Sequence, residues 1–169
     1  MTLANLTSVV TLEVKNASQL TAEDIISLNA IHTHDSSQIS RFVWEDVKRK
    51  PNDLYFFAVS SEEPGEPEII KSFRVALLVM SLNEVERFYR IKNFVTLAAW
   101  RKRGYGSWLL MEAVAYVRDM PQVRHIEYIF RRQLAYQHVE KIYTRAGFVQ
   151  VKEIDNGSPQ WLYQLSFDG

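Results

Sequence analysis

The residues best suited to chemistry form the run Arg101–Gly106 (RKRGYG), which Ser107 follows. The run stands between a predicted strand and a predicted helix, an arrangement that turns backbone N–H groups toward an anion. Gly104 and Gly106 place no side chain over these amides, and the cationic side chains and the helix dipole add a favourable field. The pattern is neither GxxxxGK[ST] nor GxGxxG, because Leu109 stands at the last glycine position. It predicts a phosphate-binding turn, and a basic turn that merely begins a helix is the alternative.

A second candidate is Tyr143, in the segment Tyr143–Phe148 (YTRAGF) near the end of a predicted helix. A buried phenol beside an anion site can act as a general acid, because its pKa of about 10 keeps it protonated at neutral pH. Such a phenol can then give its proton to a thiolate. The alternative is a core tyrosine whose ring packs and whose hydroxyl meets a backbone carbonyl. Taken alone, the position favours the core interpretation.

Length and composition limit the class of protein. The chain has 169 residues, with 20 Lys and Arg, 20 Asp and Glu, and no cysteine. This length suits a single domain over residues 1–169. The lack of cysteine excludes disulfides, thiolate metal sites and a cysteine nucleophile. Neither a membrane span nor the basic start of a signal peptide is present in the sequence, so we expect a cytoplasmic protein with no membrane partner.

The two halves of the sequence differ in charge. Residues 1–89 carry 8 basic and 13 acidic residues, a net charge of −5, and residues 90–169 carry 12 and 7, a net charge of +5. A basic C-terminal half is compatible with an anionic ligand. The overall charge of zero disfavours nucleic acid as a partner. The histidines, at positions 32, 34, 125 and 138, show no metal-ligand spacing, so no metal is expected.

Hydrophobic periodicity predicts the elements that position these candidates. The predicted strands cover 9–14, 54–60, 69–80, 89–97, 125–130 and 161–167, and the predicted helices cover 21–31, 37–50, 105–118 and 133–146. Thr21 and Asp24 form a pair typical of a capping box, and Gly147 stands where a helix C-cap glycine belongs. The helix over 105–118 is apolar on almost every face, which indicates burial. This order predicts an α+β domain around a mixed sheet.

Taken together, RxxGxG at Arg101–Gly106 and YxxxGF at Tyr143–Phe148 resemble the GNAT superfamily of acyl-CoA N-acyltransferases. The resemblance is strongest over residues 89–148. It implies the GNAT fold, a mixed and mostly antiparallel sheet flanked by about four helices, with acetyl-CoA as co-substrate. The expected function is an N-acetyltransferase that moves an acetyl group from acetyl-CoA to a primary amine. Since no cysteine can carry the acyl group, the amine would attack directly in a ternary complex.

The resemblance also implies roles for single residues. Amides of the turn would hold the pyrophosphate, and the free edge of 94–97 would pair with the pantetheine arm and supply an oxyanion donor. Tyr143 would protonate the departing thiolate. Many members carry an asparagine where this chain has Tyr136, so Gln133 or Tyr136 itself would replace that contact. The implied acetyl-CoA-binding residues are Phe94, Val95, Thr96, Leu97, Arg101, Lys102, Arg103, Gly104, Tyr105, Gly106, Ser107, Gln133 and Tyr136.

The amine must lose a proton before it attacks. Family bases lie on or near the fourth strand, where Glu84 and Glu86 precede it, and His34 and Asp35 are the second option. Family acceptor sites form at 32–37 and 153–159, where acidic residues would suit a cationic amine. A small amine, an antibiotic, a peptide N-terminus and a protein lysine all remain open, and a homodimer is compatible with the family.

Two other functions fit the sequence. A GNAT-like domain that binds acyl-CoA as a sensor or interaction module, without catalysis, is favoured by Tyr136 in place of asparagine and by the lack of a clear base. A nucleic-acid-associated protein would use the basic run Arg101–Arg103 and the basic C-terminal half. The zero net charge argues against the second.

Overall fold

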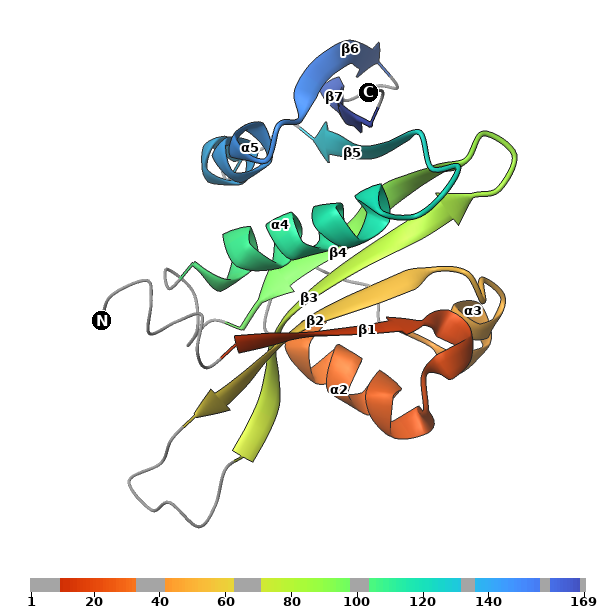
Figure 1. Ribbon diagram of the computed structural model, residues 1–169, viewed down its shortest axis with the longest axis vertical. Coiled ribbons are helices and arrows are strands. Elements are labelled where there is room, and N and C mark those ends of the chain that lie inside the picture. The colour runs from red at the N-terminus through yellow and green to blue at the C-terminus, as the bar shows by residue number, and fades with distance from the viewer. Residues whose placement is uncertain are drawn as a thin grey trace.

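A computed structural model describes residues 10–32, 42–62, 71–97, 104–131, 136–155 and 159–167. These residues form one seven-stranded mixed sheet with the order β1-β2-β3-β4-β5-β7-β6 (Figure 1). The strands are β1 (Val10–Asn16), β2 (Leu54–Glu62), β3 (Lys71–Asn83), β4 (Phe88–Thr96), β5 (His125–Arg131), β6 (Val149–Asp155) and β7 (Pro159–Ser166). The helices are the 3-10 helix η1 (Ala17–Gln19), α2 (Ala22–His32), α3 (Trp44–Lys48), α4 (Tyr105–Arg118) and α5 (Tyr136–Arg145). The predicted α+β architecture with a mixed sheet is confirmed.

Both faces of the sheet are covered, because the central strands are apolar on both sides. Alternate residues of a strand point to opposite faces, and the buried residues of β2 and β3 divide accordingly between two clusters. Phe56 and Leu78 pack under α4, and Phe57 and Leu77 pack under α2 and α3. A ligand that enters between two strands would therefore meet α4 on one face of the sheet and α2 with α3 on the other.

The prediction of one helix over 37–50 is wrong at Phe42 and Val43, which are not helical. Phe42 and Val43 precede α3, and Val43 is extended, with φ −113° and ψ 135°. Asn29 explains this conformation, because its side chain accepts a hydrogen bond from the Phe42 N–H (2.8 Å) and donates one to the Phe42 carbonyl (3.0 Å). The end of the segment before α3 is thus fixed to α2. Residues 33–41 lie outside the described residues.

The length of α4 was predicted correctly, but not its burial on almost every face. Met111 and Tyr116 are exposed, at 51% and 43%. The buried side is formed by Tyr105, Leu109, Leu110, Ala113, Val114 and Val117, which face the sheet. None of the described helices is both long enough and apolar enough to cross a bilayer. The element that the sequence prediction did not define is β6, an edge strand that exposes Val149 and Val151.

A buried ion network joins α2 to the first strands. Asp24 accepts hydrogen bonds from Lys15 Nζ (3.0 Å) and Arg74 Nη2 (2.8 Å), and Arg74 Nε also reaches Glu13 (2.7 Å). The capping box is confirmed, because Thr21 and Asp24 bond each other's backbone N–H at 2.8 and 3.1 Å. Burial alone would raise the pKa of Asp24, but the hydrogen bonds from Thr21, Lys15 and Arg74 hold it well below its usual value. Asp24 is therefore ionised and fixes the start of α2.

Candidate functional site

The two edges of β4 differ in their neighbours. Along β3 it pairs antiparallel at eight positions, from Phe88 to Thr96. Along β5 it pairs in parallel at only two, Tyr89 with Ile126 and Arg90 with Glu127. Figure 1 shows the two strands diverging beyond these pairs. Among the described residues, no strand pairs with this edge of β4 from Ile91 to Thr96, which we call the open edge.

The register of β4 decides which backbone groups face the open edge. A β-bulge places Lys92 between the pairs Met80–Ile91 and Val79–Asn93. After the bulge, the Leu97 N–H donates to the Val75 carbonyl at 2.9 Å. Alternate residues of a strand direct their backbone N–H and C=O groups to opposite sides. The backbone groups of Val95 and Leu97 therefore face β3. The N–H groups of Phe94 and Thr96 therefore face the open edge.

The start of α4 lies next to the open edge. Gly104 is the N-cap residue, has a left-handed φ of 84°, and no side chain caps the helix there. The Trp108 N–H donates to the Gly104 carbonyl (3.0 Å), so the earlier amides of the turn have no intrahelical acceptor. A Cβ atom at Gly104 would meet nothing within 4 Å. Glycine is therefore required here by the backbone conformation and not by a lack of space.

Gly106, in the first turn of α4, lies next to side chains of β4. A Cβ atom at this position would lie 3.4 Å from Thr96 Oγ1 and 3.5 Å from Phe94 Cζ. These are ordinary van der Waals distances, so a Cβ atom fits at this position and would rest against β4. The sequence suggested that both glycines keep a phosphate path clear. At Gly106 that role stays a prediction.

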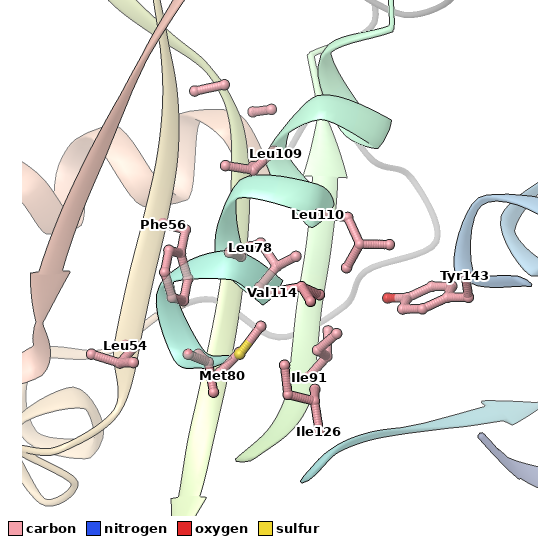
Figure 2. Packing of buried hydrophobic residues seen from close by; sticks show 14 of the residues in the cluster. Leu54, Phe56, Leu78, Met80, Ile91, Leu109, Leu110, Val114, Ile126 and Tyr143 are labelled. Atoms are coloured by element: carbon pink, nitrogen blue, oxygen red, sulfur yellow. The ribbon is translucent and has the colours of Figure 1, made fainter. Parts of the chain in front are cut away.

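Tyr143 reaches the open edge from α5. Its ring is fully buried, stacks on Tyr128 at 4.5 Å, and meets Phe94 edge-on at 6.1 Å. Figure 2 shows its hydroxyl directed from α5 toward Leu110 and Val114 of α4. Burial raises the pKa of Tyr143 well above its usual value, and Tyr128 adds to this effect. The phenol is thus a core side chain that is protonated at neutral pH and also contacts β4.

Interactions with the last strands hold α5 in place. Gly147 ends the helix with a left-handed φ of 100°, as predicted, and the Phe148 N–H donates to the Tyr143 carbonyl at 3.0 Å. The Tyr163 hydroxyl on β7 donates to Glu140 Oε1 at 2.6 Å. Burial and the Glu140 carboxylate raise the pKa of Tyr163 to about 12. These contacts hold α5 against the last strands.

An ion pair between a buried carboxylate and an exposed arginine lies where β4 and β5 part. Arg90 donates from Nε to Glu127 Oε1 at 2.7 Å and makes a second contact through Nη2. Glu127 is buried, and His125 Nε2 lies 3.6 Å from its other oxygen. His125 in turn stacks on Phe88 at 4.7 Å. Sequence reasoning missed this cluster, because its members lie on two strands far apart in the chain.

The structure brings some of the predicted site residues together. Phe94, Thr96, Gly106 and Tyr143 form one contiguous group at the open edge. Val95 points to the opposite face, where it is buried under α2. The predicted residues Arg101–Arg103 and Gln133 lie outside the described residues, as do His34 and Asp35, and the side chain of Tyr136 is not described.

Glu84 and Glu86 lie away from this group. Both are exposed in the turn between β3 and β4, where Glu84 Oε1 accepts a hydrogen bond from Asn52 Nδ2 at 2.7 Å. Glu86 lies in the turn, and Phe94 is six residues of strand beyond Phe88, where β4 begins, which corresponds to about 20 Å. The structure does not bring these carboxylates to the open edge. In the described part of the chain, no group of three or more His, Asp or Glu side chains is placed to hold a metal.

The sequence model of the acetyltransferase (GNAT) family matches residues 22–148, so the chain belongs to this family. The match covers the divergence of β4 and β5, the start of α4 and Tyr143. It confirms the family resemblance of the two motifs. No protein of curated function matches the chain significantly by sequence.

Solved acetyltransferase structures share the fold. Arabidopsis thaliana NAA60 in complex with acetyl-CoA is 16% identical, with a TM-score of 0.68 over 92% of this chain and 99% of that one. The Escherichia coli ribosomal-protein-S18-alanine N-acetyltransferase is 12% identical, with a TM-score of 0.68 over 94% and 96%. A variant of the Vibrio cholerae spermidine N-acetyltransferase SpeG is 10% identical, with a TM-score of 0.70 over 95% of each chain. At such identities the likeness establishes the GNAT fold, as the resemblance implied.

Proposed function

We propose that this protein is an N-acetyltransferase that transfers the acetyl group of acetyl-CoA to a primary amine. The observation that carries the proposal is the convergence of three features on Phe94. These are the open edge of β4, the start of α4 at Gly106, and the buried phenol of Tyr143. The solved NAA60 structure holds acetyl-CoA, and the two other relatives are N-acetyltransferases, which supports this choice of co-substrate.

The described residues suit the chemistry of acetyl-CoA. An uncapped helix N-terminus with a basic run before it attracts a pyrophosphate, and α4 offers this at Gly104. An extended chain with amide groups can add to an unpaired strand edge, and the N–H of Phe94 faces this edge of β4. When bound, acetyl-CoA supplies an acetyl group activated as a thioester.

In the proposed reaction, one backbone N–H group and one side-chain hydroxyl each have a role. The N–H of Phe94 at the open edge donates to the thioester oxygen and stabilises the negative charge that develops there. The amine nitrogen forms the new C–N bond as the C–S bond breaks, and the amine proton passes to solvent. Tyr143 donates its hydroxyl proton to the leaving sulfur and regains one from solvent before the next turnover. No covalent enzyme intermediate is required.

Thermal unfolding with and without about 1 mM acetyl-CoA tests the co-substrate first. For a dissociation constant of about 10 μM, binding adds about 2.7 kcal/mol to the free energy of unfolding. For a domain of this size, that corresponds to a rise in Tm of roughly 5–10 °C. No rise in a folded protein would contradict the proposal.

Release of free thiol in the presence of a panel of primary amines then tests catalysis. Turnover with at least one amine is the expected result. Binding of acetyl-CoA without turnover over a wide panel would instead support the non-catalytic sensor. The two measurements therefore separate the proposed enzyme from its alternative.

A further inference from the structure

A recess lies on the face of the sheet opposite α4. It is about 400 Å³ in volume, within the range of small-molecule sites. Its apolar floor includes Tyr55 and Val79, and Asn93 of β4 lines it on one side. A smaller hollow lined by Ser81 and Glu84 adjoins it, because both share Arg49, Lys50 and Asp53. Phe42, at the rim, is fixed by its two hydrogen bonds to Asn29.

Two lysines meet in this recess. The bulge in β4 directs both Lys92 and Asn93 toward it, and Lys50 approaches from the turn before β2. Both side chains line the recess, so Lys92 and Lys50 face the same space. Burial lowers the pKa of Lys92, and the adjacent Lys50 lowers it further. Two adjacent cations repel each other, so this arrangement favours an anion between them.

The carboxylates of the recess are already engaged. Asp53 is buried, accepts a hydrogen bond from Ser81 Oγ at 2.9 Å, and accepts another from the Leu82 N–H. Asp46 pairs with Arg49 at 3.5 Å. Within the described part of the chain, no carboxylate lies within 4.0 Å of the Lys50 or Lys92 nitrogen. Asp53 attracts both lysines electrostatically, but a single carboxylate offsets only one of the two positive charges, so the other is left for a ligand.

The recess also lies beside the proposed reaction centre. Asn93 lines it, and the next residue, Phe94, directs its N–H to the open edge. One residue of strand spans only about 3.3 Å. Since the start of α4, where the co-substrate is proposed to bind, is on the other face, a molecule in the recess would approach the open edge from the opposite side.

We propose that Lys92 and Lys50 bind an acidic group of the acceptor, so that the acetylated amine belongs to a molecule that also carries a carboxylate or a phosphate. This inference rests on the proposed function and names its substrate class. It adds an acidic group to the cationic amine that the acidic residues of 32–37 and 153–159 suggested. The floor of Tyr55 and Val79 would pack against the apolar part of such a molecule.

Chemical labelling of lysines tests the anion site without turnover. Reductive methylation followed by mass spectrometry reports the neutral fraction of each amine, and a bound anion lowers that fraction because it stabilises the ammonium form. With 10 mM inorganic phosphate or acetate as probe, at constant ionic strength, we expect Lys92 and Lys50 to react at least about threefold more slowly. Lys141 and Lys152, exposed on α5 and β6, are the internal controls. Unchanged rates at Lys92 and Lys50 with both probes, or equal slowing of all four lysines, would overturn the proposal.

Matched acceptors and variants connect the site to the reaction. β-Alanine is compared with β-alaninamide, and phosphoethanolamine with ethanolamine, so that the two arms separate carboxylate from phosphate. In Lys92→Met, kcat/KM for the acid of the preferred pair should fall about tenfold through a higher KM, while its neutral counterpart is unaffected. Lys152→Met, which removes the same charge elsewhere, should leave both unchanged. An equal loss for acid and neutral acceptors in Lys92→Met contradicts the proposal.

Failure of this inference is distinguishable from failure of the proposed function. If acetyl-CoA raises Tm in the wild type and in Lys92→Met, but neither anion protects the lysines, the enzyme assignment stands and the acidic acceptor is wrong. If acetyl-CoA does not raise Tm at all, the proposed function is wrong. The labelling result then still decides whether the recess binds an anion.

Discussion

The two halves of the sheet are built differently, and the boundary between them lies at the candidate site. In the first half, β1 to β4 pair antiparallel with their neighbours over most of their lengths. In the second, β5, β7 and β6 form a separate antiparallel group that carries α5. Only two residue pairs join β4 to β5 (Figure 1).

The interactions that stiffen each half also differ. The first half carries the ion network of Asp24 and Arg74, and the second is held to α5 by the hydrogen bond between Tyr163 and Glu140. Between them, the aromatic contacts of Tyr143 and the core of α4 bridge the divergence. Each half of the sheet is thus stabilised by its own contacts. The open edge of β4 therefore does not need a paired strand to keep its conformation. The predictions below act on the first half, on the boundary and on the second half in turn.

The largest effect is expected in the first half, from Asp24→Asn. The change removes the charge that Lys15 and Arg74 share, so the free energy of unfolding should fall by about 3 kcal/mol at pH 7. Because the pKa of Asp24 is lowered in the folded state, its contribution is present above about pH 4, the unfolded pKa, and is lost as pH falls below it. Urea unfolding at pH 7 and pH 3 should show the gap between wild type and variant narrowing in acid. A gap that is independent of pH would exclude the ionised network as its cause.

At the boundary, Gly104→Glu should weaken acetyl-CoA binding about 100-fold, or about 2.7 kcal/mol. A carboxylate at the N-terminus of α4 repels an anion at the same place, whereas open space around Gly104 lets the fold accommodate the side chain. Gly104→Ala is the control, because it adds only the strain of the left-handed conformation, about 1–2 kcal/mol of stability. Titration calorimetry of both variants measures the difference. Normal binding by Gly104→Glu would show that the turn does not hold the phosphates.

Local signals in the sequence predicted much of the first half and the start of the site. The capping box at Thr21, the length of α4 and the C-cap at Gly147 depend on neighbouring residues, so short-range rules suffice for them. These are the features for which the sequence and the structure agree.

Features that depend on contacts between distant segments were not predictable from the pattern. The extended chain at Val43 follows Phe42, whose backbone is hydrogen-bonded by the Asn29 side chain of α2. These bonds override an apolar pattern with a helical period. Gly106 comes to lie against Phe94 of β4, and Arg90 meets Glu127, only because segments far apart in the chain pack together there. The bulge in β4 turns Lys92 toward the recess that Lys50 also lines, and no local sequence pattern predicts this bulge.

Arg90→Met tests whether the ion pair between Arg90 and Glu127 stabilises the place where β4 and β5 part. This change leaves the buried carboxylate of Glu127 with His125 at 3.6 Å as its neighbour, so stability should fall by about 2 kcal/mol. The double variant Arg90→Met/Glu127→Met should recover most of the loss, because no unpaired charge is then buried. Urea unfolding of the single and double variants gives the coupling energy. Equal stability of wild type and Arg90→Met would mean that backbone pairing alone sets where β4 and β5 part.

In the second half, Tyr143→Phe removes one hydroxyl and keeps the ring contacts with Phe94 and Tyr128. If the phenol protonates the leaving thiolate, kcat should fall tenfold or more, at the lower end of the range for general acids, with acetyl-CoA affinity unchanged. Tyr163→Phe is the matched control, because it removes a hydroxyl from the same half that bonds Glu140. It should cost about 1 kcal/mol of stability and leave kcat unchanged. Single-turnover rates separate the chemical step from product release. An unchanged kcat in Tyr143→Phe would reduce Tyr143 to a core residue, and the second half would then contribute packing to the site but no proton.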